Sequence, residues 1–178
     1  MTSLAAEAGL LKYIEGVFDG ARSVIEDGSA LKPLGIVFSL KDPETGVSLT
    51  EPLPLAVPVT TATFDPAERQ VYAARLRAAA AETHACGMMF VHESWFRWCK
   101  EGNAAGERHE CVFAVVDHKA TEQRCWVAYI DRTGDTPKLG KHMSLTDAAN
   151  AAGFAVGQAN AKGAVGRFSR IMPKRWMN

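Results

Sequence analysis

A polar pair interrupts the most aromatic stretch of the chain. Residues 88–100 read MMFVHESWFRWCK, with His92 and Glu93 in the middle of the run. Zinc enzymes use a histidine followed by a glutamate within the motif H-E-x-x-H, but this chain has Phe96 where the second histidine should stand. The His109-Glu110 pair repeats the order and also lacks a second histidine. The sequence therefore predicts no metal site and no cofactor.

Catalysis without a metal is a second possibility for the same stretch. His92 and Glu93 would act with His118 and Asp117, on a later strand, as the acid–base groups of a hydrolase or transferase. The chain has no G-x-S-x-G segment and no cysteine within the signature of a known enzyme family. These four residues remain catalytic candidates, as an alternative to a structural role.

The structural alternative is an ion-pair network around Glu93. Arg97 follows Glu93 by four residues, and Arg124 is expected opposite Asp117 on the neighbouring strand. The sequence favours ion pairs between these groups over a catalytic carboxylate pair. Removing one partner of a buried ion pair costs about 3–5 kcal/mol. We therefore expect neutralisation of Glu93 to lower the stability of the fold.

Hydrophobic spacing and turn chemistry predict the elements that hold these residues. Apolar residues at three- and four-residue steps predict a helix over residues 3–26, which Asp27-Gly28 ends. Residues 34–55 predict a β-hairpin with its turn at DPETG, residues 42–46. Prolines at 52, 54 and 58 predict that residues 52–63 form an extended connection rather than a strand.

From residue 66 onward the sequence predicts two more helices with three strands between them. Pro66 at the first helical position after Asp65 predicts a helix to about Ala85. Ser144 and Asp147 are spaced to cap a third helix that extends to about residue 161. Between these helices we expect strands at 87–99, 110–118 and 123–132, and a loop at 133–137.

Strand register decides which side chains share a face. A loop centred near Ala104 pairs residue i with about 208 − i, and a tight turn at residues 119–122 pairs 118 with 123. One face then carries His92, His118 and Cys125, and the other carries Glu93, Trp95, Asp117, Phe113, Arg124 and Trp126. Both faces are rich in apolar groups, so we expect helices or a second subunit to cover both.

The predicted element order is α-ββ-α-βββ-α. Short links between neighbouring strands predict an α+β fold with a single five-stranded antiparallel sheet and helices packed on it. This order resembles that of the roadblock, longin and profilin-like modules. The resemblance is topological and implies the fold alone, because one fold hosts many functions. We expect a single domain over residues 1–161 and a basic tail over residues 162–178.

Charge is balanced overall but not along the chain. Lys+Arg and Asp+Glu are both 20, so no global charge attracts nucleic acid or a membrane. No acidic residue follows Asp147, whereas the tail segment GRFSRIMPKRWMN alternates cations with apolar groups. Such a pattern suits single-stranded nucleic acid or an acidic partner, and equally suits a tail that folds back on an acidic body. The residues that would bind are Arg167, Arg170, Lys174, Arg175 and Trp176.

These observations favour a small cytoplasmic binding module. The four cysteines form no C-x-x-C pair, which is typical of free thiols in a reducing compartment. No apolar run is long enough to span a membrane, and the N-terminus has no basic region typical of a signal peptide. The aromatic load of the sheet, including Trp95 and Trp126, leads us to expect a protein partner or a homodimer.

Overall fold

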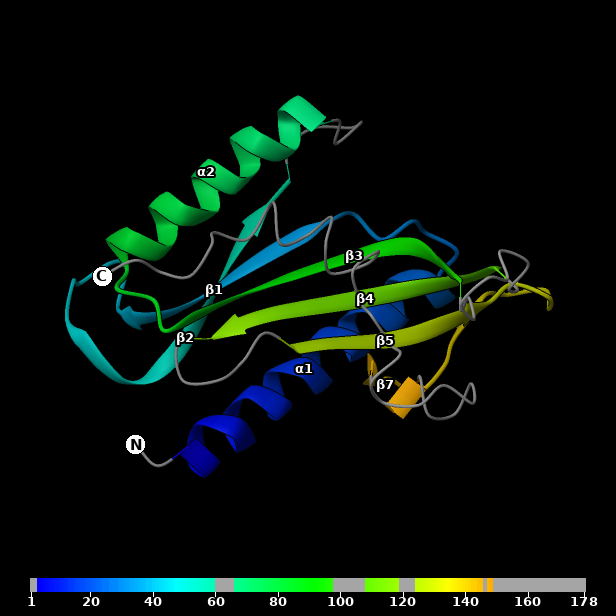
Figure 1. The fold of residues 1–178 in the computed structure, drawn as a ribbon, viewed down its shortest axis with the longest axis horizontal. Coiled ribbons are helices and arrows are strands. Elements are labelled where there is room, and N and C mark those ends of the chain that lie inside the picture. Colours follow the sequence, from blue (N-terminus) through cyan, green and yellow to red (C-terminus); the bar gives the residue numbers. More distant parts are fainter. Residues whose placement is uncertain (1–2, 60–65, 98–107, 119–123, 146, 149–178) are drawn as a thin grey trace, which may run out of the picture. The chain divides into compact units, whose positions relative to one another are not determined.

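The structure of the chain is a computed structural model that describes residues 3–59, 66–97, 108–118, 124–145 and 147–148. Within these residues it contains two helices and an antiparallel sheet, which confirms the α+β class (Figure 1). The elements are α1 (Ser3–Glu26), β1 (Leu34–Lys41), β2 (Ser48–Pro58), α2 (Pro66–Glu82), β3 (Gly87–Arg97), β4 (Arg108–His118), β5 (Arg124–Asp131), β6 (Lys138–Leu139) and β7 (Met143–Ser144).

Within the described residues the sheet has seven strands, so the prediction of five was wrong. Its order is β2-β1-β3-β4-β5-β6, and β7 also pairs with β5. After the predicted loop at 133–137, Leu139 pairs with Ile130 and Met143 pairs with Val127. A strand of two residues carries no alternating pattern, so hydrophobic periodicity could not reveal β6 or β7.

The described residues fall into two compact units. The first contains α1, β5, β6 and β7, and the second contains β1, β2 and α2. Strands β3 and β4 contribute to both units. Residues 92–97 and 108–114 belong to the first unit, and residues 87–91 and 115–118 belong to the second.

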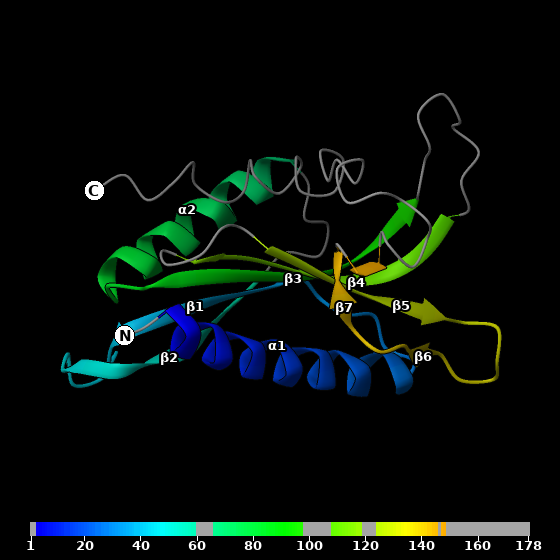
Figure 2. The same cartoon turned by 60° about the horizontal axis from the view of Figure 1, so that its bottom comes forward.

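In the first unit, α1 forms as predicted and packs against β6 (Figure 2). Gly28, with φ of 79°, ends the helix by donating to the carbonyl of Ile25, while Ser29 donates to that of Val24. This pair of bonds is a Schellman motif, which satisfies carbonyls at the helix end. The stripe that α1 buries consists of Leu10, Ile14, Phe18, Ala21 and Ile25.

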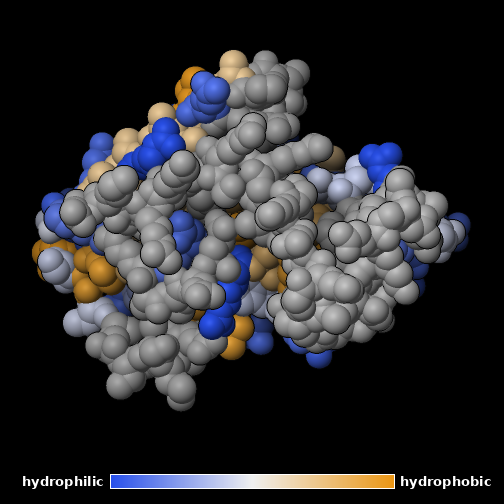
Figure 3. Space-filling model, in the orientation of Figure 1, coloured by the Kyte–Doolittle hydropathy of each residue, from blue (hydrophilic) through white to orange (hydrophobic). Residues whose placement is uncertain are grey.

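In the second unit, α2 packs on β1 through a glycine (Figures 1 and 2). A Cβ atom on Gly35 would lie 2.6 Å from a methyl of Leu76 and would also overlap the hydroxyl of Tyr72. That hydroxyl donates to the carbonyl of Val57 on β2, and burial raises the pKa of Tyr72 to about 12. Figure 3 shows hydrophilic residues interspersed with small apolar ones along the exposed side of α2.

Strand β2 corrects the prediction that the prolines end the hairpin. The turn at residues 42–46 forms as expected, since the Asp42 carboxylate accepts from the N–H groups of Glu44 and Thr45. The strand that follows nevertheless runs to Pro58, with Pro54 opposite Phe38. Among the described strands β2 lies at one end of the sheet, and an edge strand tolerates residues that lack an N–H on its outer side.

The C-terminal predictions are tested only at their beginning. The hydroxyl of Ser144 donates to the Asp147 carboxylate at 2.7 Å and accepts from the Asp147 N–H at 3.1 Å, so the predicted cap is present. The body of that helix, the boundary at residue 161 and the basic tail lie outside the described residues. Among the described residues, no helix is both long and apolar enough to cross a membrane.

Candidate functional site

The register of β3 against β4 differs from the predicted one. The ring of His92 stacks on Phe113, with centroids 5.7 Å apart and planes at 17°. Stacked side chains must share a sheet face, whereas the predicted register placed these two on opposite faces. A shift by one residue exchanges the two faces of a strand pair, so every grouping across β3 and β4 changes with it.

The corrected register brings a second carboxylate to Glu93. Arg132, the residue after β5, binds Glu93 through Nη2 at 2.8 Å and also binds Glu110 of β4. The contact with Glu110 is bidentate, with Nε at 2.7 Å and Nη2 at 2.9 Å from the two carboxylate oxygens. An ion pair at Glu93 is therefore confirmed, with Arg132 as its cation. The side chain of Arg97 lies outside the described part of the chain.

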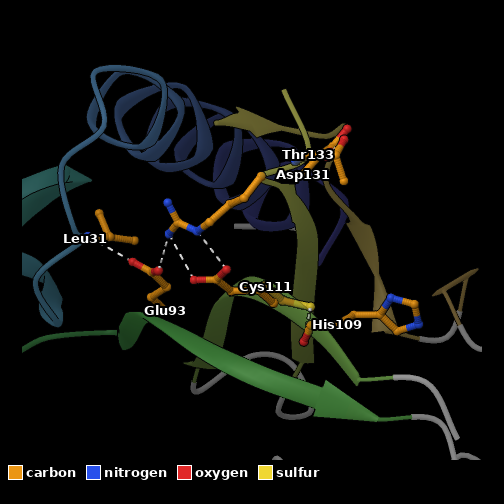
Figure 4. A network of polar contacts seen from close by, with 8 residues as sticks. Leu31, Glu93, His109, Cys111, Asp131 and Thr133 are labelled. Carbon is orange, nitrogen blue, oxygen red and sulfur yellow. Dashed lines mark hydrogen bonds and ion pairs between the residues drawn. The ribbon is translucent and has the colours of Figure 1, made fainter. Parts of the chain in front are cut away.

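A backbone group completes the cluster, which we call the Glu93–Glu110–Arg132 clasp (Figure 4). The N–H of Leu31, in the connection between α1 and β1, donates to the second oxygen of Glu93 at 3.1 Å. The clasp thus joins four segments that are far apart in the sequence. Side-chain exposure is 18% for Glu93, 14% for Glu110 and 38% for Arg132, so the carboxylates are largely covered.

The two carboxylates of the clasp have opposite electrostatic environments. Burial, followed by a hydrogen bond with Glu110, raises the pKa of Glu93 above its ordinary value, although Leu31 and Arg132 oppose the rise. The bidentate contact with Arg132 lowers the pKa of Glu110. Two carboxylates beside one arginine leave one negative charge without a cation inside the clasp. The first proton is therefore taken up more readily by this pair than by an isolated glutamate.

The histidine and aspartate candidates do not join the clasp. His92 is 5% exposed, and its Nδ1 lies 3.1 Å from the backbone carbonyl oxygen of Glu93. Asp117 and His118 belong to the second unit. Burial lowers the pKa of His118, and the Asp117 charge opposes that change. The structure thus gives His92 a place in the core beside Phe113 and unites Glu93 with residues other than the predicted ones.

Two of the described cysteines, Cys111 and Cys125, are unsuited to nucleophilic attack. Cys86, Cys111 and Cys125 are free thiols, as expected, and the last two are buried. Burial raises the pKa values of Cys111 and Cys125 to about 12. The thiolate is the reactive form of cysteine, so these two thiols are almost fully protonated at neutral pH.

The two tryptophans of the predicted binding set differ in exposure. Trp126 is 6% exposed and belongs to the core. Trp95 is 53% exposed, and the guanidinium carbon of Arg108 lies 4.4 Å from the centroid of its ring. A cation stacked on an indole is an attractive contact that also fixes the orientation of the ring. Trp95 on β3 is therefore an exposed aromatic side chain whose orientation is fixed before any partner binds.

Within the described ranges, no group of three or more His, Cys, Asp or Glu side chains is arranged to hold a metal ion. Comparison of the chain with protein-family models, curated proteins and solved structures finds no match. The resemblance to the roadblock, longin and profilin-like modules thus depends on element order alone.

Sequence reasoning missed Arg132, Glu110 and Arg108 as site residues. Arg132 is the last residue of the strand predicted at 123–132, but the predicted face groupings did not include it; in the structure β5 ends at Asp131, and the long side chain of Arg132 reaches back to the sheet. Glu110 was visible as the second His-Glu pair, but the predicted register separated it from Glu93. The signal that could have found Glu110 is the presence of a glutamate on each of two adjacent strands, with an arginine at the end of the next strand.

Proposed function

We propose that the chain is a small cytoplasmic binding module without catalytic activity, and that it associates with a second copy of itself or another protein through Trp95 and Arg108. The observation that carries this proposal is the exposed indole of Trp95, at 53%. Tryptophan and arginine are enriched among the residues that dominate the energy of protein interfaces. The pair is also preorganised, which reduces the entropy lost on binding.

Covering the pair with a partner would strengthen it. A cation–π contact contributes about 0.5–1 kcal/mol at an exposed site and about 2 kcal/mol when water is excluded. Arg108 therefore supports the indole in the free chain and contributes more in a complex. A second copy is the partner to test first, because the same pair would then meet itself across a two-fold axis.

Sedimentation equilibrium from low to high micromolar concentration tests this proposal. We expect a concentration-dependent dimer. Trp95→Ala removes the indole from both copies and should weaken the dimer about 1,000-fold, as loss of two hot-spot residues worth about 2 kcal/mol each would. Val71→Ala is the control, because Val71 is 63% exposed on α2 and lies outside the proposed pair. A monomer at every concentration, or equal weakening by Val71→Ala, would contradict self-association through this pair.

A hydrolase or transferase remains the second candidate function, and the clasp is its support. The pKa of Glu93 is raised and that of Glu110 is lowered. Enzymes separate the pKa values of two carboxyl groups in this way to obtain an acid and a base. Turnover of model esters or phosphoesters that Glu93→Gln abolishes in a folded chain would favour this candidate over the binding module.

Nucleic-acid binding by the tail is a third proposal and comes from the sequence. It depends on Arg167, Arg170, Lys174, Arg175 and Trp176, with no acidic residue after Asp147. An oligonucleotide affinity that falls steeply with salt, and a slope that becomes shallower as these cations are removed, would support it. An affinity that does not change with salt would contradict it.

A further inference from the structure

The Glu93–Glu110–Arg132 clasp holds the backbone as well as the side chains. Leu31 lies beyond the end of α1 at Glu26 and before the start of β1 at Leu34. Its N–H donates to Glu93, and this bond joins the connection to β3. The strength of the bond depends on the charge and position of the Glu93 carboxyl group.

Arg132 cannot satisfy both carboxylates equally. It meets Glu110 with Nε and Nη2 but reaches Glu93 with Nη2 alone. Bidentate contacts between arginine and carboxylate are the stronger kind, so Glu110 is the better neutralised partner. Glu93 is the group on which the surplus negative charge of the clasp falls.

We propose that Glu93 and Glu110 bind a single proton between them, and that its uptake weakens the hold of the clasp on Leu31. The proton enters from solvent and binds to the Glu93 carboxyl, whose O–H then donates to Glu110. Arg132 stays with Glu110, and the charge of the clasp falls from one negative to zero. The repulsion between the two carboxylates disappears. The other oxygen of Glu93 now belongs to a neutral carboxyl and accepts more weakly from the Leu31 N–H, because that bond favours the ionised form.

The surrounding charges allow this step. Among the described residues, the charged groups that act on Glu93 are Glu110 of β4 and Arg132, beside the Leu31 N–H. Glu110 in turn faces Arg132 and Glu93, and the neighbouring Cys111 thiol, with a pKa of about 12, is neutral. The direction of the Glu93 shift agrees with proton uptake at a pH above the ordinary glutamate range. The clasp therefore fastens the α1–β1 connection less firmly in mildly acidic solution than at neutral pH.

Carbon-13 NMR of glutamate carboxyl groups in the full chain tests the proposal, with the Leu31 amide followed in the same samples. We expect the Glu93 carboxyl and the Leu31 amide to shift together in one transition, and Glu110 to respond in the same pH range as well as in a lower one. Coupled groups titrate in shared steps of this kind.

Two variants make the test specific. Glu110→Gln removes the negative charge beside Glu93 and should move the Glu93 transition to lower pH, whereas Glu51→Gln, at an exposed position of β2, should leave it in place. A Leu31 amide that does not respond through the Glu93 transition would overturn the proposal. So would a Glu93 transition that Glu110→Gln leaves unchanged. If Glu110→Gln does not fold, the wild-type titration alone decides, because separate and simple curves for the two carboxyls also exclude a shared proton.

Discussion

The backbone N–H of Cys86 donates to the carbonyl of Phe38 at 2.9 Å. This bond shows that the polar backbone groups of Phe38 are directed toward the β3 side of β1. Pro54 stands opposite Phe38, so the pair is not hydrogen-bonded and Pro54 presents its missing N–H to the outer edge of the sheet. Pro58 lies opposite Leu34, four residues along β2 from Pro54, so its backbone nitrogen is directed to the same side of the strand. The prolines therefore block the edge where another strand could be added.

A residue with an N–H at position 54 should allow another strand to pair with the outer edge of β2. Pro54→Thr gives two successive outward donors, at 54 and 56, next to an exposed Leu53. We expect the variant to fold, because the bonds between β1 and β2 remain, but to aggregate more readily than the wild type. Light scattering at matched concentration measures the difference.

The matched control is Leu53→Thr, which introduces the same residue into β2 without adding an outward N–H. It should not increase scattering. If Pro54→Thr scatters no more than Leu53→Thr over days of incubation, the prolines do not protect the edge.

Thiol reactivity follows from burial. The pKa values of Cys111 and Cys125 are raised to about 12 by burial. At pH 8 their thiolate fraction is on the order of a thousandfold smaller than that of an ordinary cysteine. Alkylation by iodoacetamide, located by peptide mass spectrometry, should therefore be slow at both positions in the native chain and fast in urea. Equal native and unfolded rates at Cys125 would contradict this description of the core.

The carboxylate of Glu110 beside Glu93 reverses the expected effect of neutralising Glu93 on the stability of the fold. As a simple ion-pair member, Glu93 was expected to stabilise the fold through its charge. Its pKa is instead raised, so folding favours the neutral form, and the ionised form present at neutral pH costs stability. Glu93→Gln should therefore raise the urea midpoint at pH 7. The gain should shrink as the pH falls through the pKa of Glu93, because the wild-type carboxyl then becomes neutral as well.

Glu110→Gln is the matched variant with the opposite expectation. The lowered pKa of Glu110 means that its ionised form stabilises the fold above the ordinary pKa and that this contribution is lost in acid. The substitution should lower the urea midpoint at pH 7 and have less effect at low pH. Changes of the same sign in both variants at pH 7 would contradict the assignment of the surplus charge to Glu93.

Local patterns predicted most elements of this fold. The α1 stripe, the Asp42 turn and Pro66 at the start of α2 are encoded within a few residues, and each formed as expected. The second strand of the hairpin was predicted, but its extension to Pro58 was not, because a proline is tolerated only where a strand is an edge and edge position is a property of the assembled sheet.

The site was predictable only in part for a similar reason. Glu93 was recognisable as a charge in an apolar run, and an ion pair was the correct interpretation of it. Its partners depend on the register of β3 with β4 and on the reach of Arg132 from beyond β5. The register was predicted from a loop centred near Ala104, and a shift by one residue is enough to exchange the faces.

Two glycines in different surroundings should respond to the same substitution with opposite signs. Gly16 lies in the middle of α1, and a Cβ atom built there meets nothing within 4 Å. An exposed helical glycine costs about 0.5–1 kcal/mol relative to alanine, because it loses more backbone freedom on folding. At Gly35 the added Cβ would overlap Tyr72 and Leu76, and overpacking of this kind costs about 1–3 kcal/mol. Gly16→Ala should therefore raise the thermal midpoint, by about 2–4 °C per kcal/mol for a chain of this size, and Gly35→Ala should lower it.

Calorimetry of the two variants measures both changes with the same chemical substitution. A destabilised Gly16→Ala would show that this face of α1 is covered in solution, and an unchanged Gly35→Ala would show that α2 does not press on β1 at Gly35.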